Sequence, residues 1–264
     1  MPFEELKQRH AVVWSSGAYQ GVTETIADIH RVAIERLDPQ PGQRLLDLAC
    51  GTGAVAELAA AAGADVVGVD IAPALIEQAR ERAAERGLAI DYRTGDAEAL
   101  ELEDASFDLV ASTCGIMFAP DHQAVARELA RVTKQGGRIA LVCWTPESGL
   151  AQMFEVMRPF QPPSPPGVGN QFDWGREDYV RDLLADAFEL AFDRGDSVLV
   201  AESGQSVWQL FSAEYGPTKT LADSLEEEKR EELQRAFVDL HERSRTDGRI
   251  EFSRTYLLTV GTRK

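Results

Sequence analysis

The sequence has little of what a secreted, membrane-spanning or metal-binding protein needs. Its 264 residues include three cysteines, an odd number, and their spacing matches no zinc pattern. We therefore expect neither a disulfide framework nor a metal site. No run of about 18 apolar residues occurs, which argues against a transmembrane helix. The acidic first residues lack the profile of a signal peptide, so we expect a cytoplasmic protein.

A surplus of basic residues is also missing. The formal net charge is −17, and no cluster of Lys and Arg alternates with aromatic residues. A nucleic acid would have to approach an acidic surface, so we expect no nucleic-acid partner. Apolar residues make up 44% of the chain and charged residues 27%, which is typical of a globular domain.

Apolar runs of strand length alternate with helical patterns through the first half of the chain. We expect strands near residues 45–49, 65–69, 88–92, 107–112 and 138–144, with helices over 22–37, 54–62, 73–86 and 121–132 between or before them. This order predicts a doubly wound parallel sheet. Residues 190–200 and 249–260 read as two further strands that form an antiparallel pair at the sheet edge, and residues 221–245 as a long charged helix.

The most informative segment joins the first strand to the helix that follows. It carries a buried-looking Asp47 and then the turn Gly51-Thr52-Gly53, and a glycine turn before a helix points backbone N–H groups at a ligand. A charge at Asp47 must be paired, so it organises the turn or meets a cationic group. The second strand ends in Asp70, where a carboxylate can accept hydrogen bonds from a ribose diol. The pattern G-x-G-x-x-A over 51–56 keeps an NAD(P)-dependent oxidoreductase open as an alternative.

Five motifs in order separate these possibilities. They are D-L-A-C-G-T-G at 47–53, G-V-D at 68–70, G-D-A-E-A-L at 95–100, F-D-L-V at 107–110 and G-G-R at 136–138. In this combination the chain resembles the class I S-adenosylmethionine-dependent methyltransferases, close to the small-molecule group that includes the ubiquinone and menaquinone methyltransferases. The resemblance covers residues 40–144 most strongly. One departure is Ala49, where the family often has glycine.

The resemblance implies a Rossmann-like, mostly parallel seven-stranded sheet with an antiparallel last strand and helical cap insertions. It also implies S-adenosylmethionine as cofactor and assigns roles to residues of this chain. Asp47, Ala49, Gly51 and Gly53 would hold the methionine end, and Asp70 the ribose. Ile71 and Ala97 would contact the adenine, Asp96 would bind its amino group, and Thr113 would face the methyl donor centre. Related enzymes often close the site with an aromatic segment, which here would be Trp14 and Tyr19.

We expect one methyltransferase domain over residues 1–264. Its parts would be an N-terminal helical lid (1–40), a cofactor-binding core (41–145), two substrate-cap insertions (146–187 and 203–247) and a C-terminal strand pair (188–202 and 248–262). Aromatic residues in the insertions favour a small ring-bearing or lipid-like acceptor. The sequence does not specify the oligomeric state.

Among the histidines, His122 is the best candidate for a general base, because it follows the fourth strand and begins a helix. His10 could enter from the lid. His30 looks structural, and His241 is expected to be solvated. The predicted activity is methyl transfer to a small organic acceptor. A non-catalytic protein that binds S-adenosylmethionine is a further alternative, because no base is firmly assigned.

Overall fold

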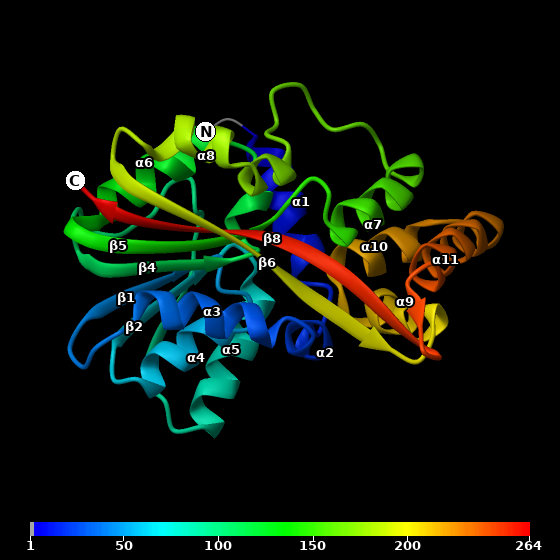
Figure 1. Cartoon of the computed structure of the whole chain (residues 1–264), viewed down its shortest axis with the longest axis horizontal. Coiled ribbons are helices and arrows are strands. Elements are labelled where there is room, and N and C mark those ends of the chain that lie inside the picture. Colours follow the sequence, from blue (N-terminus) through cyan, green and yellow to red (C-terminus); the bar gives the residue numbers. More distant parts are fainter. Residues whose placement is uncertain (1–2) are drawn as a thin grey trace.

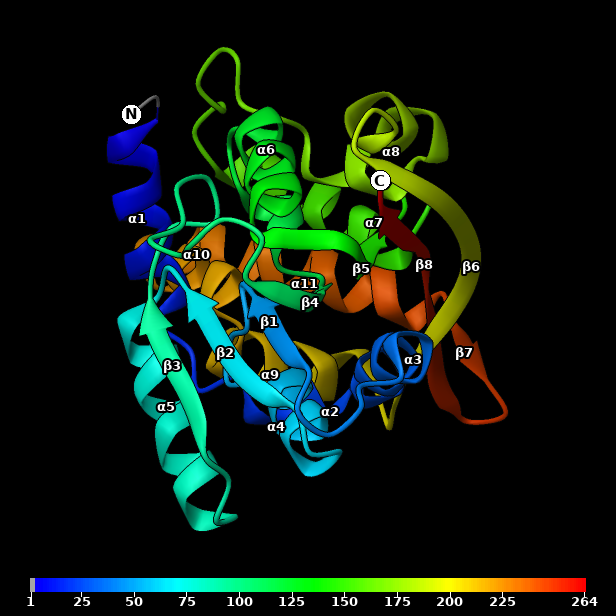
Figure 2. The ribbon, with the colours of Figure 1, turned by 90° about the vertical axis from the view of Figure 1, so that its left-hand side faces the viewer.

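A twisted central sheet with helices on both faces organises the chain, and the computed structural model describes residues 3–264. Figures 1 and 2 place α6 and α8 on one face of the sheet and α3, α4 and α5 on the other. The strands are β1 (Arg44–Leu48), β2 (Asp65–Asp70), β3 (Ile90–Thr94), β4 (Phe107–Thr113), β5 (Thr133–Trp144), β6 (Phe188–Ala201), β7 (Arg245–Thr246) and β8 (Arg249–Arg263).

The strand order is β3-β2-β1-β4-β5-β8-β6. Strands β1 to β5 run parallel, whereas β8 runs antiparallel to both of its neighbours, β5 and β6. This confirms the predicted fold class. The order reverses direction between β1 and β4, and such a switch point leaves a crevice at the carboxyl ends of the strands.

Eleven α-helices and three short 3₁₀ helices occur in residues 3–264. They are α1 (Glu4–Trp14), α2 (Gln20–Glu24), α3 (Ala27–Leu37), α4 (Ala54–Ala61), α5 (Pro73–Glu85), α6 (His122–Val132), α7 (Gly149–Met157), α8 (Glu177–Leu184), α9 (Gly204–Glu214), α10 (Gly216–Ser224), α11 (Glu227–Glu242), η1 (Ile116–Phe118), η2 (Arg158–Phe160) and η3 (Gln171–Gly175). No helix in this part of the chain has the length and apolar character needed to cross a membrane.

The buried strands explain why the sequence shows apolar runs instead of alternation. Leu45, Leu46 and Leu48 of β1 are fully buried, because helices cover both faces of the parallel half of the sheet. Local signals also set helix starts: Pro73 stands in the first turn of α5, and the Asp121 side chain accepts a hydrogen bond from the Ala124 N–H at the start of α6.

Two predictions of a single continuous helix were wrong, because each segment forms two helices. The helix expected over 22–37 is interrupted, because Ile26 has non-helical dihedrals between α2 and α3. Arg254 of β8 donates hydrogen bonds to the carbonyl and the hydroxyl of Thr25, and these contacts fix the break. The helix expected over 221–245 is also two helices. It is interrupted at Leu225, an extended residue that packs against the core between α10 and α11.

The strands β6 and β8 continue well beyond the rest of the sheet. Residues 256–262 of β8 pair with β5, whereas residues 250–255 pair with β6 and not with β5. We call this two-stranded extension the ribbon (residues 196–201 of β6 and 250–255 of β8). At its far end Asp247 and Gly248 have positive φ angles of 49° and 84° and form the turn to β7, a strand that the sequence did not predict. Figure 1 shows the ribbon reaching α9 and α11 at the far end of the molecule.

Candidate active site

The turn after β1 is built from residues in the left-handed backbone region. Ala49, Gly51 and Gly53 have φ angles of 56°, 54° and 84°. The Asp70 carboxylate at the end of β2 accepts hydrogen bonds from the Gly51 N–H (2.8 Å) and the Ala72 N–H (2.9 Å). Asp70 therefore holds the glycine turn in place. It also stands at the crevice, and its carboxylate oxygens can accept further hydrogen bonds there.

Asp47 supports this turn from behind. Its carboxylate accepts a hydrogen bond from the Ala56 N–H (2.9 Å) in the first turn of α4, and 1% of the residue is exposed. Burial raises the pKa of Asp47 to about 7, although the hydrogen bond from Ala56 opposes that effect. Burial also raises the pKa of Asp70, against the hydrogen bonds from Ala72 and Gly51. A ligand that brings hydrogen-bond donors to Asp70 would stabilise the charged form of that carboxyl group.

The loop after β3 contributes Asp96 and Ala97. The Asp96 carboxylate accepts a hydrogen bond from the Glu98 N–H (2.9 Å) and pairs with the Lys7 Nζ of α1 (2.6 Å). Lys7 also contacts the Glu98 carboxylate at 3.1 Å. Only 4% of Lys7 is exposed, so α1 is attached to the loop by a buried ionic cluster.

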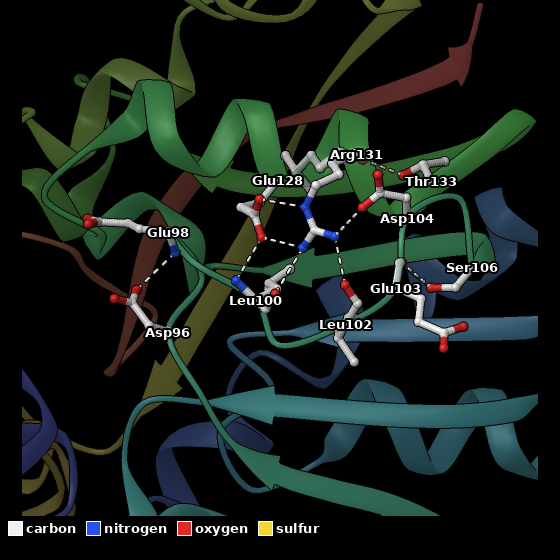
Figure 3. A network of polar contacts seen from close by, with 11 residues as sticks. Asp96, Glu98, Leu100, Leu102, Glu103, Asp104, Ser106, Glu128, Arg131 and Thr133 are labelled. Carbon is white, nitrogen blue, oxygen red and sulfur yellow. Dashed lines mark hydrogen bonds and ion pairs between the residues drawn. The ribbon is translucent and has the colours of Figure 1, made fainter. Parts of the chain in front are cut away.

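Arg131 of α6 fixes the rest of the same loop. Its guanidinium pairs with Glu128 (2.7 Å) and Asp104 (2.7 Å), and it donates hydrogen bonds to the carbonyls of Leu100 and Leu102. Figure 3 shows these contacts converging on Arg131 while Asp96 and Glu98 lie at the other end of the loop. The network holds the loop against α6 and so sets the position of Asp96 and Ala97.

One cavity connects all these parts at the carboxyl ends of the strands. Its walls include most of the residues that the resemblance assigned to the cofactor, namely Trp14, Tyr19, Ala49, Gly51, Asp70, Ile71, Asp96, Ala97 and Thr113. Asp47 and Gly53 do not line it and lie behind the turn instead. A Cβ atom at Gly51 would enter open space, whereas one at Gly53 would come within 2.1 Å of the Tyr92 hydroxyl. Gly51 therefore faces the cavity and Gly53 allows close packing against β3.

The other half of the cavity is aromatic. The rings that line it come from the lid, from η1, from the end of β5 and from α9 and the residue that follows it: Trp14, Tyr19, Phe118, Trp144, Phe211 and Tyr215. Trp14 contacts Phe118 with ring centroids 4.8 Å apart and Tyr215 at 5.8 Å. The Tyr19 hydroxyl accepts a hydrogen bond from the Gly216 N–H (2.9 Å), which joins the lid to α10. Trp14 and Tyr19 therefore share one compartment with Phe211 and Tyr215.

His10 lines the cavity, whereas His122 and His241 are placed differently from the sequence expectation. His122 does not line the cavity: its Nδ1 lies 2.8 Å from the Tyr179 hydroxyl, and its ring packs on Trp174. The geometry therefore gives no support to His122 as a base. The expectation for His241 was wrong, because the ring is fully buried between Phe237 and Phe252.

His30 and Arg254 line the cavity, and neither was among the site residues predicted from the sequence. His30 of α3 places Nδ1 2.8 Å from the Thr113 hydroxyl, and its buried Nε2 has no partner among residues 3–264. The sequence did contain a signal for Arg254. In the alternating segment 249–260 it has the same parity as the apolar residues Phe252 and Tyr256, which predicts a charged side chain on the inner face of the strand.

Known proteins are similar to this chain in sequence and in fold. A family model described as a methyltransferase domain matches residues 46–141. An uncharacterized protein of Mycobacterium tuberculosis (strain ATCC 25618 / H37Rv) is 35% identical over 266 residues, which cover 99% of this chain and 96% of that protein. The nocamycin O-methyltransferase of Saccharothrix syringae is 36% identical over 142 residues, or 52% of this chain and 51% of that enzyme.

A solved structure of geranyl diphosphate methyltransferase in complex with S-adenosylmethionine has the same fold, with a TM-score of 0.56 and 19% identity over 90% of this chain and 85% of that one. The fold, the motifs and these relatives together show that the chain belongs to the class I S-adenosylmethionine-dependent methyltransferases. It is an enzyme that uses S-adenosylmethionine, and the oxidoreductase and non-catalytic alternatives are set aside.

Proposed function

We propose that this methyltransferase methylates a small ring-bearing organic acceptor, which binds in the aromatic half of the cavity. The observation that carries the proposal is the continuity of that cavity. It runs from the glycine turn, Asp70 and Asp96 to the rings of Phe118, Trp144 and Tyr215. A compartment walled by aromatic rings favours a flat apolar guest over a small polar amine or thiol.

We assign the cofactor to the half of the cavity formed by β1, β2 and β3. The methionine end would lie at the turn around Ala49 and Gly51, and the ribose hydroxyls would donate to Asp70. Ile71 and Ala97 would enclose the adenine, whose amino group would donate to Asp96. The raised pKa of the Asp70 carboxyl group and the open space in front of Gly51 support this placement.

When bound, S-adenosylmethionine supplies an activated methyl group on a sulfonium centre. The contribution of the chain is alignment and exclusion of water. Thr113 and His30 would border the sulfonium end, because both line the cavity beside β4. The rings of Trp14 and Tyr19 would lie over the positive charge, to which aromatic faces are attracted.

Calorimetry on variants tests the cofactor assignment. Asp70→Ala should weaken binding of S-adenosylmethionine and of its demethylated product by about a hundredfold, because a charge-assisted hydrogen bond and the support of the turn are both lost. Asp65→Ala at the other end of β2 is the matched control, since Asp65 is exposed and pairs with Arg44 outside the cavity. Equal affinities for the two variants would contradict the assignment.

Turnover tests the acceptor class. Release of demethylated cofactor should occur with phenols or quinol precursors and be near background with small aliphatic amines and thiols. Phe118→Ala should raise KM for the ring-bearing acceptor more than it changes the affinity for the cofactor product. A clear preference for the aliphatic compounds would overturn the proposal.

A further inference from the structure

Arg254 is a buried cation in the wall of the acceptor half. It belongs to β8, 2% of the residue is exposed, and it lines the cavity next to Trp144. The guanidinium carbon lies 5.6 Å from the centre of the Trp144 ring, at the carboxyl end of β5. The charge therefore stands among the rings assigned to the acceptor and away from the carboxylates assigned to the cofactor.

All the hydrogen-bond acceptors of Arg254 are neutral oxygens. Nε donates to the Ser197 carbonyl (3.3 Å), Nη1 to the Thr25 hydroxyl (3.0 Å), and Nη2 to the Thr25 carbonyl (2.5 Å) and the Ser197 hydroxyl (3.1 Å). A guanidinium has five N–H groups, so these four contacts leave one N–H of Nη1 for another acceptor. The backbone contacts fix the orientation of the fork before any guest arrives.

The charge itself has no direct counter-ion within residues 3–264. Asp28 reaches Arg254 only through Ser197, whose hydroxyl donates to the Asp28 carboxylate (3.0 Å). Among the cavity residues the other cation is Lys7, and it already pairs with Asp96 and Glu98. Burial lowers the pKa of Arg254 to about 10, against the influence of Cys114 and Asp28. An uncompensated buried charge is costly, and an anionic guest removes that cost.

We propose that the acceptor is a ring-bearing carboxylic acid whose carboxylate pairs with Arg254 while its ring lies among the aromatic side chains. This inference rests on the proposed function and adds the charge of the substrate to it. Arg254 acts as a specificity-determining residue: a carboxylate gains a charge-assisted hydrogen bond there, whereas a neutral amide of the same shape leaves the guanidinium unpaired.

The test compares a carboxylate with its neutral counterpart on the wild-type protein. The probes are 1-naphthoate and 1-naphthamide, titrated calorimetrically into protein saturated with S-adenosylhomocysteine at pH 7.5. We expect naphthoate to bind about tenfold to a hundredfold more tightly than naphthamide. Equal affinities, tighter binding of the amide, or no binding of naphthoate would each overturn the inference.

Two variants show whether Arg254 is the source of the preference. Arg254→Met should reduce the preference to within about twofold and keep the affinity for S-adenosylhomocysteine. The control Arg245→Met, at an exposed residue of β7 that pairs with Glu242, should keep the full preference. Survival of the preference in Arg254→Met would overturn the inference.

Two safeguards separate the possible failures. If Arg254→Met does not fold, Arg254→Lys replaces it and should keep a reduced preference, because the charge remains but the fork is lost. An unchanged preference in Arg254→Lys together with equal affinities in a folded Arg254→Gln would support the charge at position 254, and not the guanidinium geometry, as the source of the preference. If the wild-type protein does not bind S-adenosylhomocysteine, the cofactor assignment has failed and not the acceptor charge.

Discussion

At the scale of single residues, Ala49 carries a backbone strain that a glycine at this position would not. Its φ of 56° lies in the left-handed region, where a Cβ atom is unfavourable by about 1–2 kcal/mol. The methyl group and the carbonyl oxygen of Ala49 also limit which residue fits at position 115. A Cβ at position 115 would come within 2.5 Å of the Ala49 Cβ and 2.6 Å of its carbonyl oxygen, so Gly115 is the only residue that fits opposite.

Ala49→Gly should therefore stabilise the protein by about 0.5–1 kcal/mol, since relief of the strain exceeds the greater backbone entropy of glycine in the unfolded state. Urea denaturation measures the change. Ala62→Gly is the control, because Ala62 ends α4 with an ordinary φ of −80° and should lose stability or stay unchanged. A loss of stability in Ala49→Gly equal to that in Ala62→Gly would contradict the strain argument.

His30 makes the stability depend on pH. Burial lowers its pKa from 6.5 to about 4, so the unfolded chain binds a proton at pH values where the folded protein does not. Stability from this group is complete above pH 6.5 and is lost as the pH falls towards 4, by about 3 kcal/mol in total. His30→Gln should remove that part of the dependence. The measured quantity is the difference in unfolding free energy between wild type and variant at pH 7.5 and at pH 4.5, and an identical difference at both values would contradict the assignment.

At the scale of elements, the lid helix α1 is held by charges and not by a large apolar face. Lys7, His10 and Trp14 form its inner face, and the Lys7 ammonium lies between the carboxylates of Asp96 and Glu98. The helix closes the cavity over the loop to which the adenine is assigned. Opening of the lid must therefore separate a buried ionic cluster.

Lys7→Met should free the lid, because it leaves the buried Glu98 carboxylate without its cation. We expect the amide protons of α1 to exchange about tenfold to a hundredfold faster, and the cofactor to dissociate faster, while the exchange of β1 and β4 stays unchanged. Lys229→Met is the control, since Lys229 pairs with Glu232 on the exposed side of α11. Unchanged exchange in α1 would show that other contacts hold the lid.

The same scale separates what the sequence could predict from what it could not. The strands and helices of the core could be predicted from local patterns. The apolar run of β1, the proline in α5 and the alternation of β8 each predicted the element that the structure has. Helix interruptions do not, because the break at Ile26 is fixed by Arg254 from a strand more than two hundred residues further on. The role of His30 was hidden for the same reason, since only the fold brings it to Thr113.

At the scale of the whole molecule, the strong negative charge opposes the binding of an anion. The net charge of −17 repels a carboxylate in solution even though Arg254 favours it inside the cavity. Capture and retention of such an acceptor therefore depend on different charges, one spread over the surface and one buried.

Ionic strength should separate the two effects. Raising the salt concentration from about 10 mM to about 150 mM shortens the Debye length from about 30 Å to about 8 Å, so the association rate of naphthoate should rise several-fold. The association rate of the neutral naphthamide should stay constant, and the dissociation rate of naphthoate should change little because Arg254 is buried. Stopped-flow fluorescence measures these rates, and a fall in the naphthoate association rate with salt would contradict long-range repulsion.

The ribbon of β6 and β8 offers one way to change the depth of the acceptor half of the cavity. Side chains alternate between faces with a period of two, so inserting two residues in each strand leaves every neighbour on its present side. Each such step would move the far helices outward by about 7 Å, deepening the chamber without touching the glycine turn. A variant of this chain with such paired insertions should then accept longer molecules with an unaltered methyl-donor pocket.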